Sequence, residues 1–190
     1  MISKPKGTYD VLPKESSGWN RLEETIRKIC RLYNYKEIRT PIFESFQVFH
    51  RDLNDASDMV TKETYDFTDR GERMITLRPE GTAGVARAYI ENKMYVENPV
   101  SKLFYMGPMF RYERPQKGRT RQFAQFGVEA LGSDSPYIDA EVIALGASLI
   151  RALGLKDVAV KINTLGDEES RNRYREVLVS YFTQYKDCLL

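Results

Sequence analysis

The sequence predicts an α+β fold with a largely antiparallel sheet and helices around it. The first reason is the order of the patterns, because strand-like segments arrive in a block between helical segments instead of alternating with them. The second is a pair of long stretches, 102–111 and 122–131, that are rich in aromatic and β-branched residues. The loop between them contains Pro115 and Gly118, which indicates a hairpin with a long connection.

The chain begins with a predicted amphipathic helix over 15–34. A short strand over 36–40 follows and should stop at Pro41, because proline cannot donate to a ladder. Apolar side chains at spacings of three and four give the helix one buried stripe. These residues are Trp19, Leu22, Ile26, Ile29 and Tyr33.

A second short strand is expected over 74–78, followed by a helix over 83–92. The hydroxyl of Thr82 can cap this helix. Glu80 lies in the tight turn between strand and helix, where a carboxylate either binds a ligand or stabilises the dipole of the helix that follows. The pattern alone leaves both roles open.

A further helix is signalled at both ends. Ser135 can cap it, Pro136 occupies its first position and Gly154 closes it. The predicted buried stripe consists of Ile138, Val142, Leu145 and Leu149.

The last part of the chain alternates as a strand over 158–163, and Asp167 can cap a final helix. The turn at 163–167 is the predicted domain boundary. We therefore expect a first domain over 1–165 and the start of another segment or insertion over 166–190.

Composition narrows the chemistry. The formal net charge is +2, and no apolar run approaches the ~18 residues of a membrane helix, so we expect a cytoplasmic protein without membrane association. The single histidine, His50, nearly excludes His-based triads and His-rich metal sites. Cys30 and Cys188 lack metal-ligand spacing. Any reaction must therefore use Arg, Glu, Gln and a bound cofactor or carboxylate-held metal.

The hairpin at 110–129 has an unusual polar face. Successive side chains of a strand alternate between faces, so Arg111 and Glu113 share one face of the first strand. On the second strand, the apolar face carries Ala124, Phe126 and Val128, and the other carries Phe123, Gln125, Gly127 and Glu129. Gly127 leaves room for a ligand on the sheet, and Phe123 offers a ring for stacking.

The loop of this hairpin is strongly basic. Guanidinium forks suit polyphosphate oxygens, although a solvated basic hairpin fits the same pattern. The additional basic residues are Arg114, Lys117, Arg119 and Arg121.

Four segments in order resemble the histidyl-tRNA synthetase family, which belongs to class II of the aminoacyl-tRNA synthetases. They are PKGTYDVLP near the amino terminus, EIRTPIFE as motif 1, TLRPEGT, and FRYERPQKGRTRQFAQFGVE as motif 2. The resemblance implies a class II antiparallel sheet flanked by helices. It also implies a cytoplasmic homodimer that uses Mg²⁺ and ATP to activate L-histidine and transfers it to tRNA(His).

The resemblance implies the following residue roles. Arg111 would be catalytic, contacting the α-phosphate and the histidine carboxylate, and Pro41 would lie at the dimer interface. The implied ATP-binding residues are Arg111, Glu113, Arg119 and Phe123. The implied histidine-binding residues are Glu80, Gly81, Thr82, Arg111, Gln125 and Glu129.

The family's motif 3 arginine, its tyrosine-containing histidine signature and its anticodon-binding domain are not found before Leu190. We therefore expect the chain to be the amino-terminal part of a catalytic domain and not to aminoacylate tRNA alone. Two alternatives remain. One is the regulatory synthetase-like subunit of ATP phosphoribosyltransferase, which generally erodes the motif 2 loop, and the other is a nonenzymatic RNA-binding module.

Overall fold

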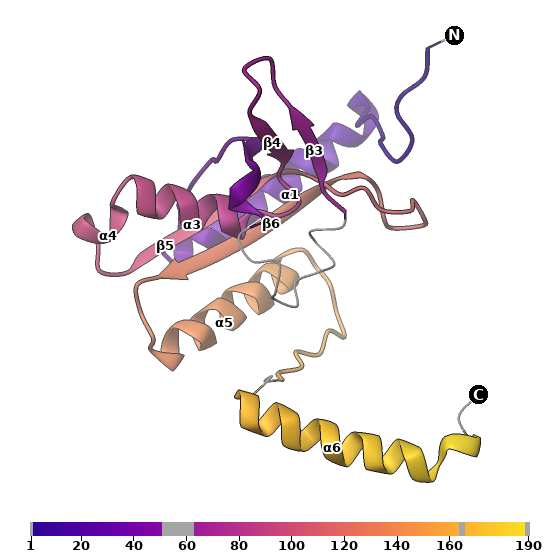
Figure 1. Cartoon of the computed structure of the whole chain (residues 1–190). Helices are drawn as coiled ribbons and strands as arrows, with labels where there is room; N and C mark the ends of the chain where they lie inside the picture. The colour runs from indigo at the N-terminus through magenta and orange to yellow at the C-terminus, as the bar shows by residue number, and fades with distance from the viewer. Residues whose placement is uncertain (1, 51–62, 164–165, 189–190) are drawn as a thin grey trace. The chain divides into compact units, whose positions relative to one another are not determined.

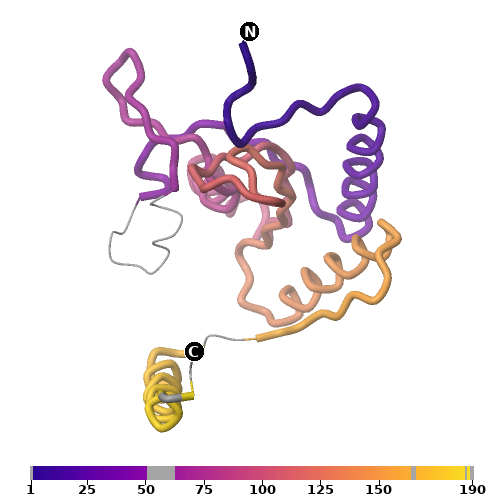
Figure 2. Tube along the Cα trace, turned by 90° about the vertical axis from the view of Figure 1, so that its right-hand side faces the viewer, coloured from indigo at the N-terminus to yellow at the C-terminus, as the bar shows by residue number. Residues whose placement is uncertain are grey.

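The computed structural model describes residues 2–50, 63–163 and 166–188. The chain divides into two compact units, Met1–Lys156 and Asp157–Leu190. Figures 1 and 2 show the chain from two directions. Each unit is described by itself below.

The central sheet of the larger unit has the strand order β1-β5-β6. The long strands β5 (Ser101–Phe110) and β6 (Gln122–Leu131) pair antiparallel, with Ser101 opposite Leu131 and Phe110 opposite Gln122. This confirms the predicted hairpin and its largely antiparallel character. The exception is β1 (Lys36–Glu37), which runs parallel to β5 and is shorter than the predicted strand over 36–40.

A second sheet has the order β2-β4-β3 and is antiparallel throughout. It consists of β2 (Phe43–Ser45), β3 (Tyr65–Thr68) and β4 (Met74–Leu77), and the short 3-10 helix η1 (Phe46–Val48) follows β2. At the tip of the β3–β4 hairpin, the Asp69 carboxylate accepts backbone hydrogen bonds from Gly71 and Arg73 at 2.8 and 3.0 Å. These bonds hold the turn that projects from the unit in Figure 2.

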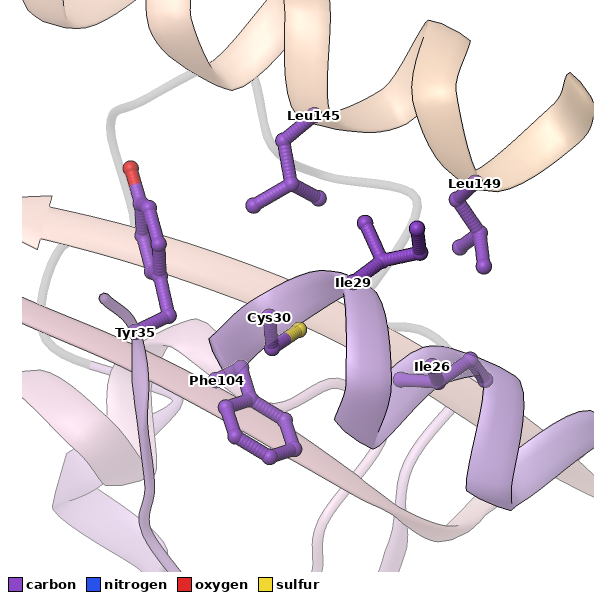
Figure 3. Packing of buried hydrophobic residues seen from close by; sticks show 7 residues of the cluster. All are labelled: Ile26, Ile29, Cys30, Tyr35, Phe104, Leu145 and Leu149. Carbon is purple, nitrogen blue, oxygen red and sulfur yellow. The ribbon is translucent and has the colours of Figure 1, made fainter. Parts of the chain in front are cut away.

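Two helices cover one face of the central sheet, namely α1 (Pro13–Leu32) and α5 (Pro136–Ala152). The Tyr33 hydroxyl lies 2.8 Å from Ser148 Oγ and joins the end of one helix to the other. Figure 3 shows the buried cluster, which consists of Ile26, Ile29, Cys30, Tyr35, Phe104, Leu145 and Leu149. Phe126 and Val128 pack against this cluster, which confirms that their face of β6 receives helices, while Ala124 stays exposed.

The opposite face carries a smaller cluster beneath α3 (Thr82–Glu91), which the short helix α4 (Met94–Glu97) follows. The buried members of this cluster are Val85, Leu103, Tyr105 and Met109. Phe123 is partly buried against it. The central sheet is thus a layer between helices, and the polar positions predicted on β6 lie on its α3 side.

The helix caps differ in part from the prediction. Neither Thr82 nor Ser135 caps a helix with its side chain. Thr82 is the first residue of α3 and its hydroxyl bonds elsewhere, while Glu80 accepts the free amides of that turn. The Asp167 cap is confirmed, since its carboxylate accepts a hydrogen bond from Ser170 N at 2.7 Å. Gly154, with φ of +80°, ends α5 as predicted.

The smaller unit contains α6 (Glu168–Gln184) and the 3-10 helix η2 (Lys186–Cys188). The predicted strand over 158–163 is wrong, because this segment is exposed and joins no sheet within the described part of the chain. Its apolar alternation is present, but a strand also needs a paired neighbour. Among the described residues, no helix is long and apolar enough to cross a membrane.

Leu145 allows a test of the core beneath α5. Its side chain is 1% exposed, so Leu145→Ala leaves a cavity and should lower the free energy of unfolding by about 2–5 kcal/mol. Leu32→Ala makes the same chemical change at a position that is 73% exposed, and it should change the stability by less than about 0.5 kcal/mol. Equal urea midpoints for the two variants would contradict the assigned core.

Candidate active site

The turn between β4 and α3 brings a carboxylate and an arginine together. Pro79 is fully buried, and its carbonyl oxygen accepts a hydrogen bond from Arg111 Nε at 2.9 Å. Glu80 follows at once, and its carboxylate accepts hydrogen bonds from the amides of Thr82 and Ala83. Glu80 therefore stabilises the first turn of α3, one of the two roles that the sequence left open.

A second carboxylate reaches this turn from the central sheet. Thr82 Oγ1 donates a 2.7 Å hydrogen bond to Glu129 Oε1 on β6. Burial raises the pKa of Glu129, and the charge of Glu80 adds to this, whereas hydrogen bonds from Thr82 and Tyr105 oppose it. The structure thus brings together two carboxylates that the sequence separates widely.

Tyr105 forms the floor of this region and was missed by the sequence analysis. It lies opposite Gly127 in the β5–β6 register, and its ring occupies the space that a Cβ atom on Gly127 or Gly81 would need. The prediction that Gly127 leaves room for a ligand is therefore wrong, because Tyr105 fills that room. Burial raises the pKa of the Tyr105 phenol, and the charges of Glu129 and Glu80 raise it further.

Gln125 adds an unsatisfied acceptor to the same face of β6. Its Oε1 atom is buried and has no hydrogen-bond partner among the described residues. Buried polar atoms are normally paired, so this oxygen favours an incoming donor. Together with the carboxylates of Glu80 and Glu129, it makes this end of the site suited to a group rich in N–H donors.

The other end of the site is basic. The Arg111 guanidinium lies over the Phe123 ring, with 5.2 Å from Cζ to the ring centroid. Glu113 is held between two cations, 4.0 Å from Arg111 and 3.5 Å from Arg119. The Arg119 side chain is 66% exposed, whereas that of Glu113 is 14% exposed. An exposed guanidinium is therefore available beside the better fixed Arg111.

Pro41 belongs to neither the β4–α3 turn nor the β5–β6 hairpin. It is exposed just before β2, and its carbonyl oxygen lies 3.4 Å from a guanidinium nitrogen of Arg78. Arg78 was also missed by the sequence analysis, although it stands in the TLRPEGT segment. It is 8% exposed, and burial lowers the pKa of its guanidinium.

An antiparallel sheet that presents an arginine-rich hairpin beside two carboxylates is the arrangement of the class II aminoacyl-tRNA synthetase fold. Comparisons with known proteins identify the branch. The sequence profile described as "Histidyl-tRNA synthetase" matches residues 7–166, and the chain belongs to this family.

Curated relatives agree with this assignment. The histidine–tRNA ligase of Acholeplasma laidlawii is 59% identical over 186 residues, covering 98% of this chain and 44% of that protein. The histidine–tRNA ligase of Lactiplantibacillus plantarum is 55% identical over 188 residues, with the same two coverages. The chain thus spans less than half the length of these relatives.

Solved structures show the same fold. The apo histidyl-tRNA synthetase of S. aureus matches with a TM-score of 0.76 and 45% identity, covering 100% of this chain and 44% of that one. A Bacillus halodurans protein, described as an ATP phosphoribosyltransferase regulatory subunit/histidyl-tRNA synthetase, matches with a TM-score of 0.71 and 26% identity. That match covers 82% of this chain and 39% of the other.

The raised pKa of Glu129 predicts how stability depends on pH. The folded protein resists ionising this carboxyl, so its contribution to stability is greatest below the ordinary glutamate pKa and is lost as pH rises through the raised value. Glu129→Gln removes this loss. The variant should gain stability relative to the unmodified chain as the pH rises above the ordinary glutamate pKa of about 4.3, measured as the midpoint of thermal unfolding.

Glu37→Gln provides a control of opposite sign. Burial acts to raise the pKa of Glu37, but hydrogen bonds from Arg39 and Arg27 outweigh it and the pKa is lowered. This carboxylate therefore stabilises the fold above the ordinary glutamate pKa, and its removal should cost more at neutral than at acid pH. The same pH trend in both variants would contradict the environment assigned to Glu129.

Proposed function

We propose that this chain is the ATP- and histidine-binding part of a histidine–tRNA ligase. The complete enzyme would join L-histidine to ATP, forming histidyl-adenylate, and then transfer histidine to tRNA(His). The observation that carries the proposal is the bond from Arg111 to the Pro79 carbonyl. It fixes the guanidinium between the acidic turn at Glu80 and the basic loop, where an amino-acid carboxylate must meet the α-phosphate.

The acidic end of the site suits histidine. The carboxylates of Glu80 and Glu129 can balance an α-ammonium group and accept from an imidazole N–H. The buried oxygen of Gln125 supplies another acceptor. Gly81 and Thr82 complete this end, since the Thr82 hydroxyl orients the Glu129 carboxylate through its 2.7 Å hydrogen bond.

The basic end suits ATP. The Phe123 ring can stack on the adenine, and Glu113 can accept from the adenine amino group. Glu113 is paired with Arg119 at 3.5 Å. Arg119 would exchange this contact for the outer phosphates, which costs little because its side chain is mostly exposed.

The proposed reaction requires no protein nucleophile. The histidine carboxylate attacks the α-phosphorus in line, and the bond from that phosphorus to the bridging oxygen of pyrophosphate breaks. Arg111 would hold the carboxylate and the α-phosphate together and stabilise the negative charge that develops on the phosphoryl oxygens. Its pairing with the Pro79 carbonyl fixes its orientation beforehand.

Magnesium would enter the site bound to ATP, as part of the nucleotide substrate. Among the described residues, no group of three or more His, Cys, Asp or Glu side chains lies close enough to hold a metal ion. Mg²⁺ is commonly held by phosphate oxygens and water with few protein ligands. We therefore propose Mg²⁺–ATP as the substrate and assign no magnesium ligand to this chain.

A role in translation also implies a cytoplasmic location, where tRNA is charged.

The regulatory-subunit alternative has the weaker support. The curated ligases reach 59% identity, whereas the Bacillus halodurans protein described in part as a regulatory subunit reaches 26%. The regulatory subunit generally erodes the motif 2 loop, whereas this chain retains Glu80, Glu113, Arg119 and Phe123.

Arg111→Ala tests the proposed chemistry. In a protein of the relatives' full length that contains this sequence, the variant should lower histidine-dependent exchange of pyrophosphate into ATP by at least about a hundredfold. Arg39→Ala removes an arginine whose side chain is 77% exposed and should leave the rate unchanged. Full exchange activity in Arg111→Ala would refute the proposal, and tight, salt-sensitive RNA binding by the 190-residue chain itself without ATP would favour an RNA-binding module instead.

We further propose that the chain forms a homodimer through the region of Pro41. Two residues after Pro41, Phe43 lines a hollow together with Phe67 and Met74, and these three residues are 55%, 44% and 47% exposed. Clustered apolar side chains of this size are typical of protein interfaces. We propose that a second copy of the chain covers these apolar side chains.

Phe43→Glu places a charge in this surface and should convert the dimer to a monomer, as measured by light scattering after size exclusion. Val96→Glu makes the same kind of change on α4, where the side chain is 71% exposed, and should leave the dimer intact. A monomeric unmodified chain, or a dimer that survives Phe43→Glu, would overturn the assigned interface.

A further inference from the structure

The amino-terminal segment forms a tight turn against the base of the basic loop. Both the amide and the hydroxyl of Thr8 bond to the Pro5 carbonyl, at 3.2 and 2.8 Å. Gly7 lies inside this turn with φ of +84°, a conformation that favours glycine. From residue 2 to residue 12 no side chain is buried, so this segment adds nothing to the core.

One carbonyl connects this turn to the hairpin. The Gly7 oxygen accepts backbone hydrogen bonds from Arg121 at 2.7 Å and from Gln122 at 3.3 Å. The Arg121 carbonyl in turn accepts a hydrogen bond from Arg111 N at 2.9 Å. Gly7 is thus separated from the backbone of Arg111 by a single residue of the opposite arm.

Close packing adds a second constraint. A Cβ atom on Gly7 would lie 2.7 Å from Cγ and 2.9 Å from Cδ of Arg121. The bare Gly7 backbone therefore covers the stem of this arginine. Its guanidinium lies 4.2 Å from the centroid of the Tyr112 ring, and its Nε donates to the Glu113 carbonyl at 3.2 Å. The turn, the stem and both arms of the loop form one connected set.

We propose that the amino-terminal turn is a positioning element for nucleotide binding, with Gly7 as its positioning residue. By fixing Arg121 on the second arm, the turn sets the spacing between that arm and the first arm, which carries Arg111 and Glu113. Gly7 touches neither histidine nor ATP in this scheme. The inference rests on the proposed function, because the loop is a nucleotide site only if that proposal holds.

Gly7→Ala tests the inference, with Gly154→Ala as the matched control. Both glycines have nearly the same positive φ, +84° and +80°, but only Gly7 has side-chain atoms within contact of a new Cβ. With the 190-residue chain, Gly7→Ala should weaken Mg²⁺–ATP binding by about tenfold to a hundredfold, with a much smaller loss of histidine binding, which shares only Arg111 with the displaced loop. Gly154→Ala should change neither dissociation constant.

Amide hydrogen exchange supplies a readout that does not depend on ATP. Gly7→Ala should accelerate exchange at Arg121 and Gln122, whereas Gly154→Ala should not. A chain lacking residues 1–7 should show the same acceleration. This deletion keeps the test decisive if the turn adjusts to the alanine methyl group without losing its hydrogen bonds. If the unmodified chain binds no ATP, the proposed function fails in this chain, and unchanged exchange in the deletion variant overturns the positioning role separately. If Gly7→Ala changes neither the exchange at Arg121 and Gln122 nor the ATP affinity, the positioning role of Gly7 is also overturned.

Discussion

The buried guanidinium of Arg78 joins the two sheets on which the site is built. Its Nε donates to the Pro108 carbonyl on β5 at 2.9 Å, and another nitrogen donates to the Thr40 carbonyl before β2 at 2.9 Å. The backbone of Arg78 also joins the two sheets. Its amide donates a hydrogen bond to the Ile42 carbonyl, and its carbonyl accepts one from the Phe110 amide, at 2.9 Å each. Because a buried charge without partners is costly, these contacts hold as a set, and lysine could not reproduce the planar fork.

This junction explains the position of the acidic turn. Arg78 directly follows β4, so fixing it also fixes Pro79 and Glu80, which come next in the chain. Arg111 then bonds to the Pro79 carbonyl from the hairpin side. The two halves of the site are therefore held by buried backbone contacts, while the groups that would meet a ligand remain partly exposed. The same guanidinium contacts Pro41, so the proposed dimer surface and the proposed site share one support.

The sequence predicted the features that depend on local pattern. Alternation along β6 assigned Phe126 and Val128 to the helix-covered face, and the position of Asp167 identified a helix cap. It could not predict features set by long-range packing. The Tyr105 ring over Gly127 depends on register across the hairpin. The segment 158–163 joins neither sheet of the described part of the chain, and its own alternating pattern could not reveal this. Glu80, not Thr82, satisfies the first amides of α3, because Thr82 is itself the first residue of the helix and does not occupy the capping position before it.

Tyr105, Gly81 and Gly127 form one unit of packing drawn from a strand, a turn and a second strand. The ring lies where a methyl group at either glycine would stand. A larger side chain at either glycine therefore requires a smaller side chain at position 105. Natural variation should therefore reach these three positions by paired exchange and not by single replacement. A library randomised at only one of them would return mainly the parental residue, whereas randomising all three together could yield alternative floors of different shape.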